Sequence, residues 1–156
     1  MTIAKRLKDH LDAQGVAYQT VAHPRTATAS ETAEAAHIPG RSMAKTVVIH
    51  LESGPMLAVV PSSHRVDLGA LQELLDRRLG LASETEIGAL FDDCDAGAAP
   101  PVGPAYGVPA VIDRSLSGLD RVWFEGGDHR TLVCVAGADF DRLMQGARQG
   151  GFSHAV

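Results

Sequence analysis

Lysine is scarce in this sequence, which holds only three lysines beside eleven arginines among its 156 residues. Lys5 and Lys8 lie near the start, so Lys45 is the only ammonium side chain in the rest of the chain. The formal net charge of -5 argues against general nucleic-acid binding, because affinity for a polyphosphate comes mainly from lysine and arginine. We therefore expect no DNA partner. A local basic patch, or simply a solvated face, is offered by His23, Arg25, Arg41, Lys45, His64 and Arg65.

Long apolar runs and a cysteine framework are also missing. No run approaches the roughly 18 residues that cross a bilayer. The first fifteen residues mix charges where a signal peptide needs an apolar core. Cys94 and Cys134 form no paired spacing motif. We therefore expect a cytoplasmic protein with reduced thiols and no membrane partner.

The length and the apolar content fit one folding unit. A chain of 156 residues that is 45% hydrophobic can bury a core without disulfides. We expect a single domain over residues 1–156, in which residues 150–156 form a frayed tail.

Capping residues predict where the helices begin. Thr28 with Glu31 and Ser83 with Glu86 have the spacing of capping boxes, and Asp67 can cap a leucine-rich helix. Thr2 is the predicted cap of the first helix. The predicted helices cover about residues 3–14, 29–37, 68–75, 84–91 and 138–147.

Apolar and β-branched runs predict the strands, and Gly and Pro mark the breaks between them. Residues 61–65 form a polar loop, and residues 92–109, with four prolines and three glycines, form a functional loop. Strands joined by short turns, with helices between groups, indicate an α+β fold with a mixed, mainly antiparallel sheet flanked by helices. The predicted strands cover residues 18–21, 46–51, 56–60, 77–81, 110–112, 122–124 and 132–135.

Three short segments combine a special backbone with a polar side chain or a rigid turn. Lys45 precedes the strand at 46–51, GAAPPVG covers residues 97–103, and GGDH covers residues 126–129. Each has an ordinary interpretation: a charge that protects a sheet edge, a rigid turn, and a hairpin turn with a solvated histidine. Taken alone, none of them indicates a function.

Together the three segments match a family. The chain resembles the YbaK/prolyl-tRNA synthetase associated domain family over nearly its whole length. The resemblance rests on Lys45 in AKTVV, on the GxxxP signature at residues 97–101 followed by Gly103, and on GGDH. It implies a barrel-like mixed sheet, hydrolysis of mischarged aminoacyl-tRNA, and no metal, no cofactor and no covalent protein nucleophile.

The resemblance also implies roles for individual residues. The backbone at Gly97, in a loop stiffened by Pro101, would hold the ester and the attacking water. Lys45 would hold the phosphate or ribose of the terminal adenosine as a point charge. His129 would line the amino-acid pocket, place the substrate or move a proton, unless it is a structural turn histidine. Further substrate-binding candidates are Arg41, Ser42, His64, Arg65, Gly103, Gly127 and Asp128.

We therefore expect a free-standing deacylase that hydrolyses tRNA carrying a wrong, small amino acid: serine, threonine, alanine or cysteine. A positioned water would attack the ester, with help from the terminal ribose hydroxyl of the tRNA. The expected partner is the acceptor end of an aminoacyl-tRNA, and an aminoacyl-tRNA synthetase or an elongation factor is a further candidate. Two alternatives stay open: a noncatalytic module that binds an aminoacyl-tRNA end or a synthetase, and a hydrolase of small esters or nucleotides.

Overall fold

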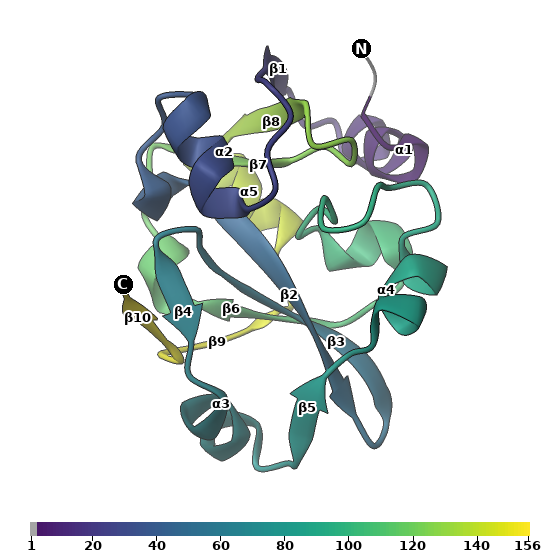
Figure 1. Ribbon diagram of the computed structural model, residues 1–156, viewed down its shortest axis with the longest axis vertical. Coiled ribbons are helices and arrows are strands. Elements are labelled where there is room, and N and C mark those ends of the chain that lie inside the picture. The colour runs from purple at the N-terminus through teal and green to yellow at the C-terminus, as the bar shows by residue number, and fades with distance from the viewer. Residues whose placement is uncertain (1–2) are drawn as a thin grey trace.

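The chain forms five α-helices and ten β-strands within residues 3–156, which are the residues that the computed structural model describes (Figure 1). The helices are α1 (Lys5–Ala13), α2 (Ala29–Ala35), α3 (Leu68–Leu75), α4 (Glu84–Leu90) and α5 (Gly137–Leu143). The strands are β1 (Gln19–Ala22), β2 (Ala44–Leu51), β3 (Gly54–Pro61), β4 (His64–Val66), β5 (Leu79–Leu81), β6 (Ala110–Asp113), β7 (Arg121–Glu125), β8 (Thr131–Ala136), β9 (Arg148–Gly150) and β10 (Ser153–Ala155).

Three of the helices begin where their caps predict. The side chains of Thr28, Asp67 and Ser83 each accept a hydrogen bond from the backbone N–H three residues later. Such a bond satisfies one of the free donors in the first turn. The predicted cap Thr2 lies outside the described residues, and α1 begins at Lys5. Among residues 3–156, no helix is long and apolar enough to cross a membrane.

The strands of the described residues lie in three sheets. The largest is mixed and has the order β5-β2-β3-β6-β9, in which β2 pairs antiparallel with β3 and β5 while β3–β6 and β6–β9 are parallel. A three-stranded antiparallel sheet has the order β1-β8-β7, and β4 pairs with β10. The predicted α+β class with mixed, mainly antiparallel pairing is confirmed.

Two large hydrophobic clusters and a small third one, formed by Ala33, Met43 and Leu132, hold these layers together. The main cluster lies between the five-stranded and the three-stranded sheets and includes Val48, Phe124 and Val133. Helices α1 and α5 add Leu7 and Phe140 to it. The second cluster lies on the other face of the five-stranded sheet, where α3 packs (Figure 1). The two larger sheets therefore enclose a common core, in a barrel-like arrangement.

The prediction of a frayed tail at residues 150–156 is wrong. Strand β9 pairs with β6 and strand β10 pairs with β4. Phe152, between them, is 1% exposed and belongs to the cluster beneath α3. The predicted loop at 61–65 is wrong for the same reason, because β10 gives His64 and Arg65 a strand partner. A partner about ninety positions away leaves no local pattern in the sequence.

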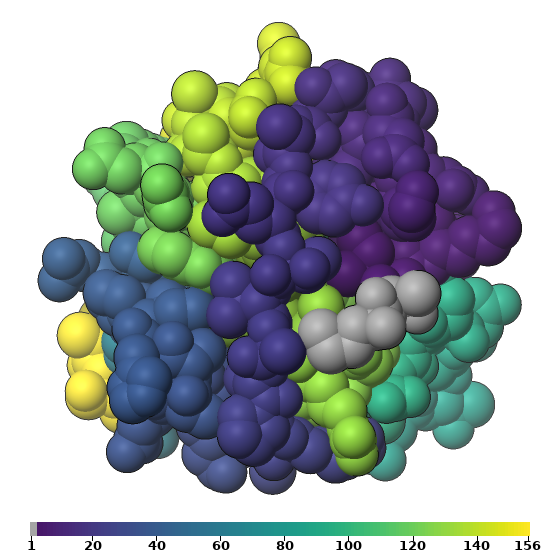
Figure 2. Space-filling model, turned by 90° about the horizontal axis from the view of Figure 1, so that it is seen from above, coloured from purple at the N-terminus to yellow at the C-terminus, as the bar shows by residue number. Residues whose placement is uncertain are grey.

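The segment after β1 brings the N-terminal part of the chain to the turn between β7 and β8. Figure 2 shows the violet segment that follows β1 beside the light green turn. The backbone N–H of His23 donates to the Arg130 carbonyl oxygen at 2.9 Å. This contact brings His23 next to residues of the GGDH turn.

Candidate functional site

A cleft of about 440 Å³ opens between β2, α4 and the loop at residues 94–99. Thr46 and Val48 line the cleft from β2, Ile87 and Phe91 line it from α4 and its C-terminal end, and Gly97 lines it from the loop. Its size lies within the range of roughly 300–1,000 Å³ that is common for small-molecule sites. We refer to this space as the cleft.

Gly97 brings exposed backbone to the wall of the cleft. Its φ of +81° lies in the left-handed region that residues with a Cβ disfavour. A Cβ added there would lie 3.3 Å from both Cε1 and Nε2 of His129. Glycine therefore allows the loop to pass close to the histidine while its backbone stays accessible from the cleft.

His129 is a buried residue, so the interpretation of a solvated turn histidine is wrong. It is 6% exposed and has a φ of +59°. Its Nε2 contacts the carbonyl oxygen of Ala96, the residue before Gly97. Its Nδ1 lies 3.7 Å from Oε2 of Glu125. The fold thus brings together Gly97 and His129, which lie far apart in the sequence.

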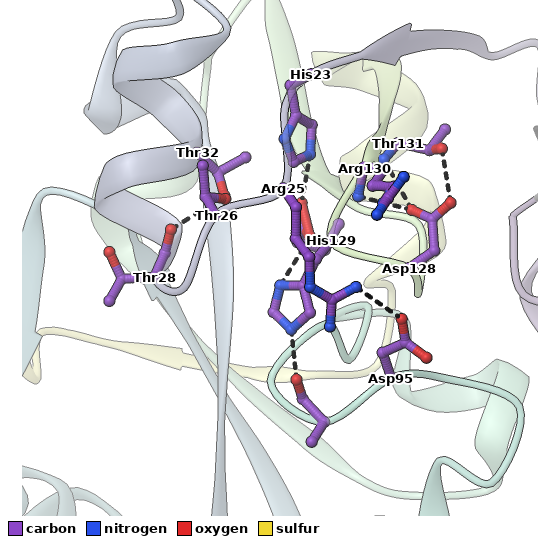
Figure 3. A network of polar contacts seen from close by, with 12 residues as sticks. His23, Arg25, Thr26, Thr28, Thr32, Asp95, Asp128, His129, Arg130 and Thr131 are labelled. Carbon is purple, nitrogen blue, oxygen red and sulfur yellow. Dashed lines mark hydrogen bonds and ion pairs between the residues drawn. The ribbon is translucent and has the colours of Figure 1, made fainter.

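Glu125 lies between two histidines, His23 and His129, which are labelled in Figure 3. Its Oε1 is 3.0 Å from Nε2 of His23, and the other ring nitrogen of His23 is 2.7 Å from the Pro24 carbonyl oxygen. Glu125 is 7% exposed. Burial raises the pKa of Glu125, although the neighbouring His23 and His129 oppose that shift.

Asp128 faces its own turn. Its carboxylate accepts hydrogen bonds from the backbone N–H groups of Arg130 and Thr131, both at 2.8 Å, and from the Thr131 hydroxyl at 3.0 Å. Although burial raises it, these hydrogen bonds together hold the pKa of Asp128 below its ordinary value. Gly127 lies against Ala4 and Cys94. Both residues shape the turn that presents His129.

Lys45 lies outside the cleft, in a more polar environment. It is the second residue of β2 and is half-buried, and its Nζ donates to the carbonyl oxygen of His64 at 2.6 Å. The His64 ring contacts the Ser153 hydroxyl at 2.8 Å, and Arg65 is exposed. Burial lowers the pKa of Lys45, and the charge of Arg65 lowers it further. We refer to Lys45, His64 and Arg65 as the basic corner.

The cleft and the basic corner lie on opposite faces of β2. Successive side chains of a strand point to opposite faces, so Lys45 points away from its neighbour Thr46, which lines the cleft. Strand β5 pairs only with Ile49–Leu51. Among the described residues, no strand pairs with the Lys45–Val47 part of β2 on the side away from β3, whereas the Val48 carbonyl oxygen accepts a hydrogen bond from the Ala82 N–H at 3.0 Å. A ligand at this free edge can therefore contact both faces.

The remaining candidates lie apart from the cleft. Arg41 and Ser42 line a separate hollow beside Trp123. Pro101 and Gly103 are buried in the loop at 92–109, and a Cβ at Gly103 would lie 2.3 Å from the Val108 carbonyl oxygen. Pro101 and Gly103 therefore pack inside the loop, and neither residue lines the cleft.

Cys94 lines the cleft but is a poor nucleophile. Burial raises the pKa of its thiol to about 12, so the reactive thiolate is scarce near neutral pH. Among residues 3–156, no three His, Cys, Asp or Glu side chains are grouped so that they could hold a metal ion.

Sequence reasoning missed Thr46 and Glu125, and it placed His23 in a local basic patch, although His23 is buried. Thr46 lines the cleft, and its hydroxyl is buried and has no hydrogen-bond partner among residues 3–156. Glu125 and His23 form the buried contact behind His129. The only local signal for Glu125 is its position directly before GGDH, and a threonine in a strand is too common to stand out.

Comparison with known proteins identifies relatives of the chain. Residues 23–143 match the sequence model of the aminoacyl-tRNA editing domain. Proline–tRNA ligases from two strains of Xanthomonas oryzae pv. oryzae, MAFF 311018 and KACC10331 / KXO85, are each 35% identical over 106 residues, or 66% of this chain. The match spans only 18% of the length of those ligases.

Solved structures share the fold over nearly the whole chain. A crystal structure described as a candidate trans-editing enzyme for prolyl tRNA synthetase is 29% identical, has a TM-score of 0.83, and is covered over 97% of each chain. A scaffold protein from work on epitope backbone grafting is 28% identical with a TM-score of 0.83, over 98% of this chain and 97% of the scaffold. The match to a hypothetical protein, 22% identical with a TM-score of 0.83, covers 96% of this chain and 100% of the other and supports the fold alone.

Proposed function

Because the chain belongs to the aminoacyl-tRNA editing domain family, in its YbaK-like branch, we propose that it is a trans-editing hydrolase. Its substrate is a tRNA that carries a wrong, small amino acid: serine, threonine, alanine or cysteine. It acts in the cytoplasm beside prolyl-tRNA synthetase, since the trans-editing relative is described for that synthetase.

The observation that carries this proposal is the backbone of Gly97 at the cleft. An aminoacyl ester is already activated, so its hydrolysis needs a positioned water and stabilisation of the developing oxyanion more than a strong base. Backbone groups of a fixed loop can supply both. His129 holds this loop through the Ala96 carbonyl oxygen. Nucleophilic attack by water also agrees with a Cys94 thiol that stays protonated.

The amino acid occupies the cleft in this proposal. Ile87, Phe91 and Val48 offer apolar contact, and the Thr46 hydroxyl is a buried group that still lacks a hydrogen-bond partner among residues 3–156. Such a group can bind the hydroxyl of a serine or threonine side chain, or the amino group of the substrate.

The acceptor end of the tRNA lies along the free edge of β2 and reaches the basic corner. An ammonium group has three N–H donors, and the structure shows one of them on the His64 carbonyl oxygen. The others are suited to a phosphate or to the terminal ribose, whose free hydroxyl assists the attack of water on the ester.

The test is hydrolysis of a panel of tRNAs charged with serine, threonine, alanine or cysteine, with correctly charged prolyl-tRNA as control. We expect loss of the ester for at least one of the four above the uncatalysed rate, and none for the control. Stoichiometric binding without turnover would instead favour the noncatalytic module. Equal activity on free aminoacyl-adenosine would favour a hydrolase of small esters.

A further inference from the structure

A chain of buried polar contacts runs from His23 through Glu125 and His129 to the loop that contains Gly97. Each of the two carboxyl oxygens of Glu125 faces a different histidine, at 3.0 Å from His23 Nε2 and 3.7 Å from His129 Nδ1. The far nitrogen of each ring faces a backbone carbonyl oxygen, that of Pro24 or that of Ala96. Glu125 is thus the only group of these that contacts both rings.

The contacts specify where protons must lie. A carbonyl oxygen only accepts, so His23 carries a proton on Nδ1 and His129 carries one on Nε2. The other ring nitrogens would then be acceptors that face an acceptor carboxylate. The 3.0 Å contact between His23 and Glu125 therefore needs one further proton, held on either partner.

Glu125 makes no hydrogen bond with the second histidine, His129. At 3.7 Å, Oε2 and His129 Nδ1 are too far apart for a hydrogen bond. Oε2 is buried and has no hydrogen-bond partner among residues 3–156. A proton on Nδ1 would close the gap and pull the ring, together with the Ala96 carbonyl that it contacts, toward Glu125.

We propose that Glu125 and His23 are positioning residues that set the place of the Gly97 loop through His129, according to the number of protons that this buried group holds. This inference rests on the proposed function, because the Gly97 backbone is the part that acts on the ester. Glu125 itself lies behind His129 and is not a catalytic residue.

The direction of the pH effect follows from the contacts. Burial raises the pKa of Glu125, so the proton shared with His23 persists to higher pH than that of an ordinary carboxyl group. When that proton is lost as the pH rises, a buried carboxylate faces two nitrogen lone pairs and repels them. His129 then moves away and the loop loses its fixed position. The loop is therefore ordered at lower pH and relaxes as the pH rises.

Few other charged groups approach this unit. The carboxylate of Asp128 acts on Glu125 from the same turn, in the direction that favours its protonated form. On the outer side, Arg25 and Asp95 form an exposed ion pair at 3.6 Å near His129 (Figure 3). These opposite charges offset each other and are screened by water, so the two histidines dominate the surroundings of Glu125.

The first experiment needs no substrate. The amide N–H of Gly97 shares a peptide group with the Ala96 carbonyl, so its NMR signal reports the contact with His129. We expect this signal to shift in the wild-type protein over a pH range above that in which an ordinary carboxyl group titrates, and to shift less in Glu125→Gln, whose side chain does not titrate. A wild-type Gly97 signal that is constant over this range would overturn the inference.

The second experiment measures deacylation against pH. We expect Glu125→Gln to lower kcat on the order of tenfold to a hundredfold, the scale of a misplacement of about 1 Å, with little change in KM. It should also remove the decline of activity toward high pH. The matched control is His50→Gln, which removes an exposed histidine–glutamate contact with Glu86 and should keep the wild-type profile.

Two outcomes separate this inference from the proposed function. If the wild-type protein deacylates no tRNA, the proposed function fails while the Gly97 signal still decides the inference. If Glu125→Gln is folded and keeps the wild-type kcat and pH profile, the inference fails and the function stands. Should Glu125→Gln not fold, His23→Gln, which replaces the ring that contacts Glu125 by an amide, should likewise lower kcat with little change in KM.

Discussion

The cleft and the basic corner differ in almost every physical respect, although consecutive residues of β2 contribute to both. The cleft is lined mainly by apolar side chains and a glycine backbone, with Glu84 and Asp95 also in its wall, and its polar support is a buried carboxyl group between two histidines. The basic corner holds a half-buried ammonium group beside an exposed guanidinium group. A reaction centre benefits from fixed groups shielded from water, whereas a phosphate needs accessible cations. Mutations on the two faces should therefore affect different kinetic constants.

The largest effect is expected for Gly97→Ala in the cleft. An alanine here would have to keep the left-handed backbone conformation of Gly97. Its Cβ would also lie 3.3 Å from the His129 ring, so the loop has to shift. We expect kcat to fall on the order of a hundredfold with little change in KM.

The matched control is Gly107→Ala, whose φ is +67° and whose new Cβ would meet no atom within 4 Å among the described residues. It carries the same backbone strain of roughly 1–2 kcal/mol but should keep its activity. Equal losses in both variants would refute a special role for Gly97.

A smaller effect, on KM rather than on kcat, is expected for Lys45→Ala in the basic corner. Loss of a charge-assisted contact worth about 1.5–3 kcal/mol should raise KM tenfold to a hundredfold and leave kcat largely intact. The slope of log KM against log salt should fall by about 0.7, as for one lost phosphate contact to a single strand. Lys5→Ala, which removes an exposed lysine paired with Asp9, is the control. A loss in kcat alone would place Lys45 in the chemistry instead.

The smallest effect is expected for Thr46→Val, which keeps the shape of the side chain and removes the hydroxyl. Activity on seryl- and threonyl-tRNA should fall about threefold to tenfold, the value of one hydrogen bond of 0.5–1.5 kcal/mol, while alanyl-tRNA is affected less. Because the hydroxyl is buried without a partner among residues 3–156, thermal unfolding should show a slightly more stable variant. Thr20→Val on the exposed strand β1 is the control. An equal loss of activity on seryl-, threonyl-, alanyl- and cysteinyl-tRNA would mean that Thr46 does not bind the amino-acid side chain.

Much of the fold could be predicted because its signals are local. The caps Thr28, Asp67 and Ser83 act on backbone groups three residues away, so their spacing is visible in the sequence. The β2–β3 hairpin is equally local, since its two strands are joined by a tight turn. The tail could not be predicted, because a frayed end and the short strands β9 and β10 look alike until β6 and β4 provide partners.

The candidate site divides in the same way. The GxxxP and GGDH segments pointed to Gly97 and His129, and the fold brings these two together. The same reasoning grouped Lys45 with them, yet Lys45 lies on the other face of β2, because strand alternation and the position of α4 decide which face lines the cleft. Arg41 and Ser42 were predicted as substrate-binding residues, yet they line a separate hollow.

The sequence by itself determined the helices, most of the strands, three of the caps and the family, because periodicity, capping and motif spacing are properties of neighbouring residues. Only the tertiary structure decided that Glu125 meets His23 across 102 positions of the chain, that His129 is buried against the Gly97 loop, and that Phe152 closes the second core. These contacts depend on how sheets and helices pack in three dimensions, and a buried polar contact between distant segments leaves no period or spacing that a single sequence can show.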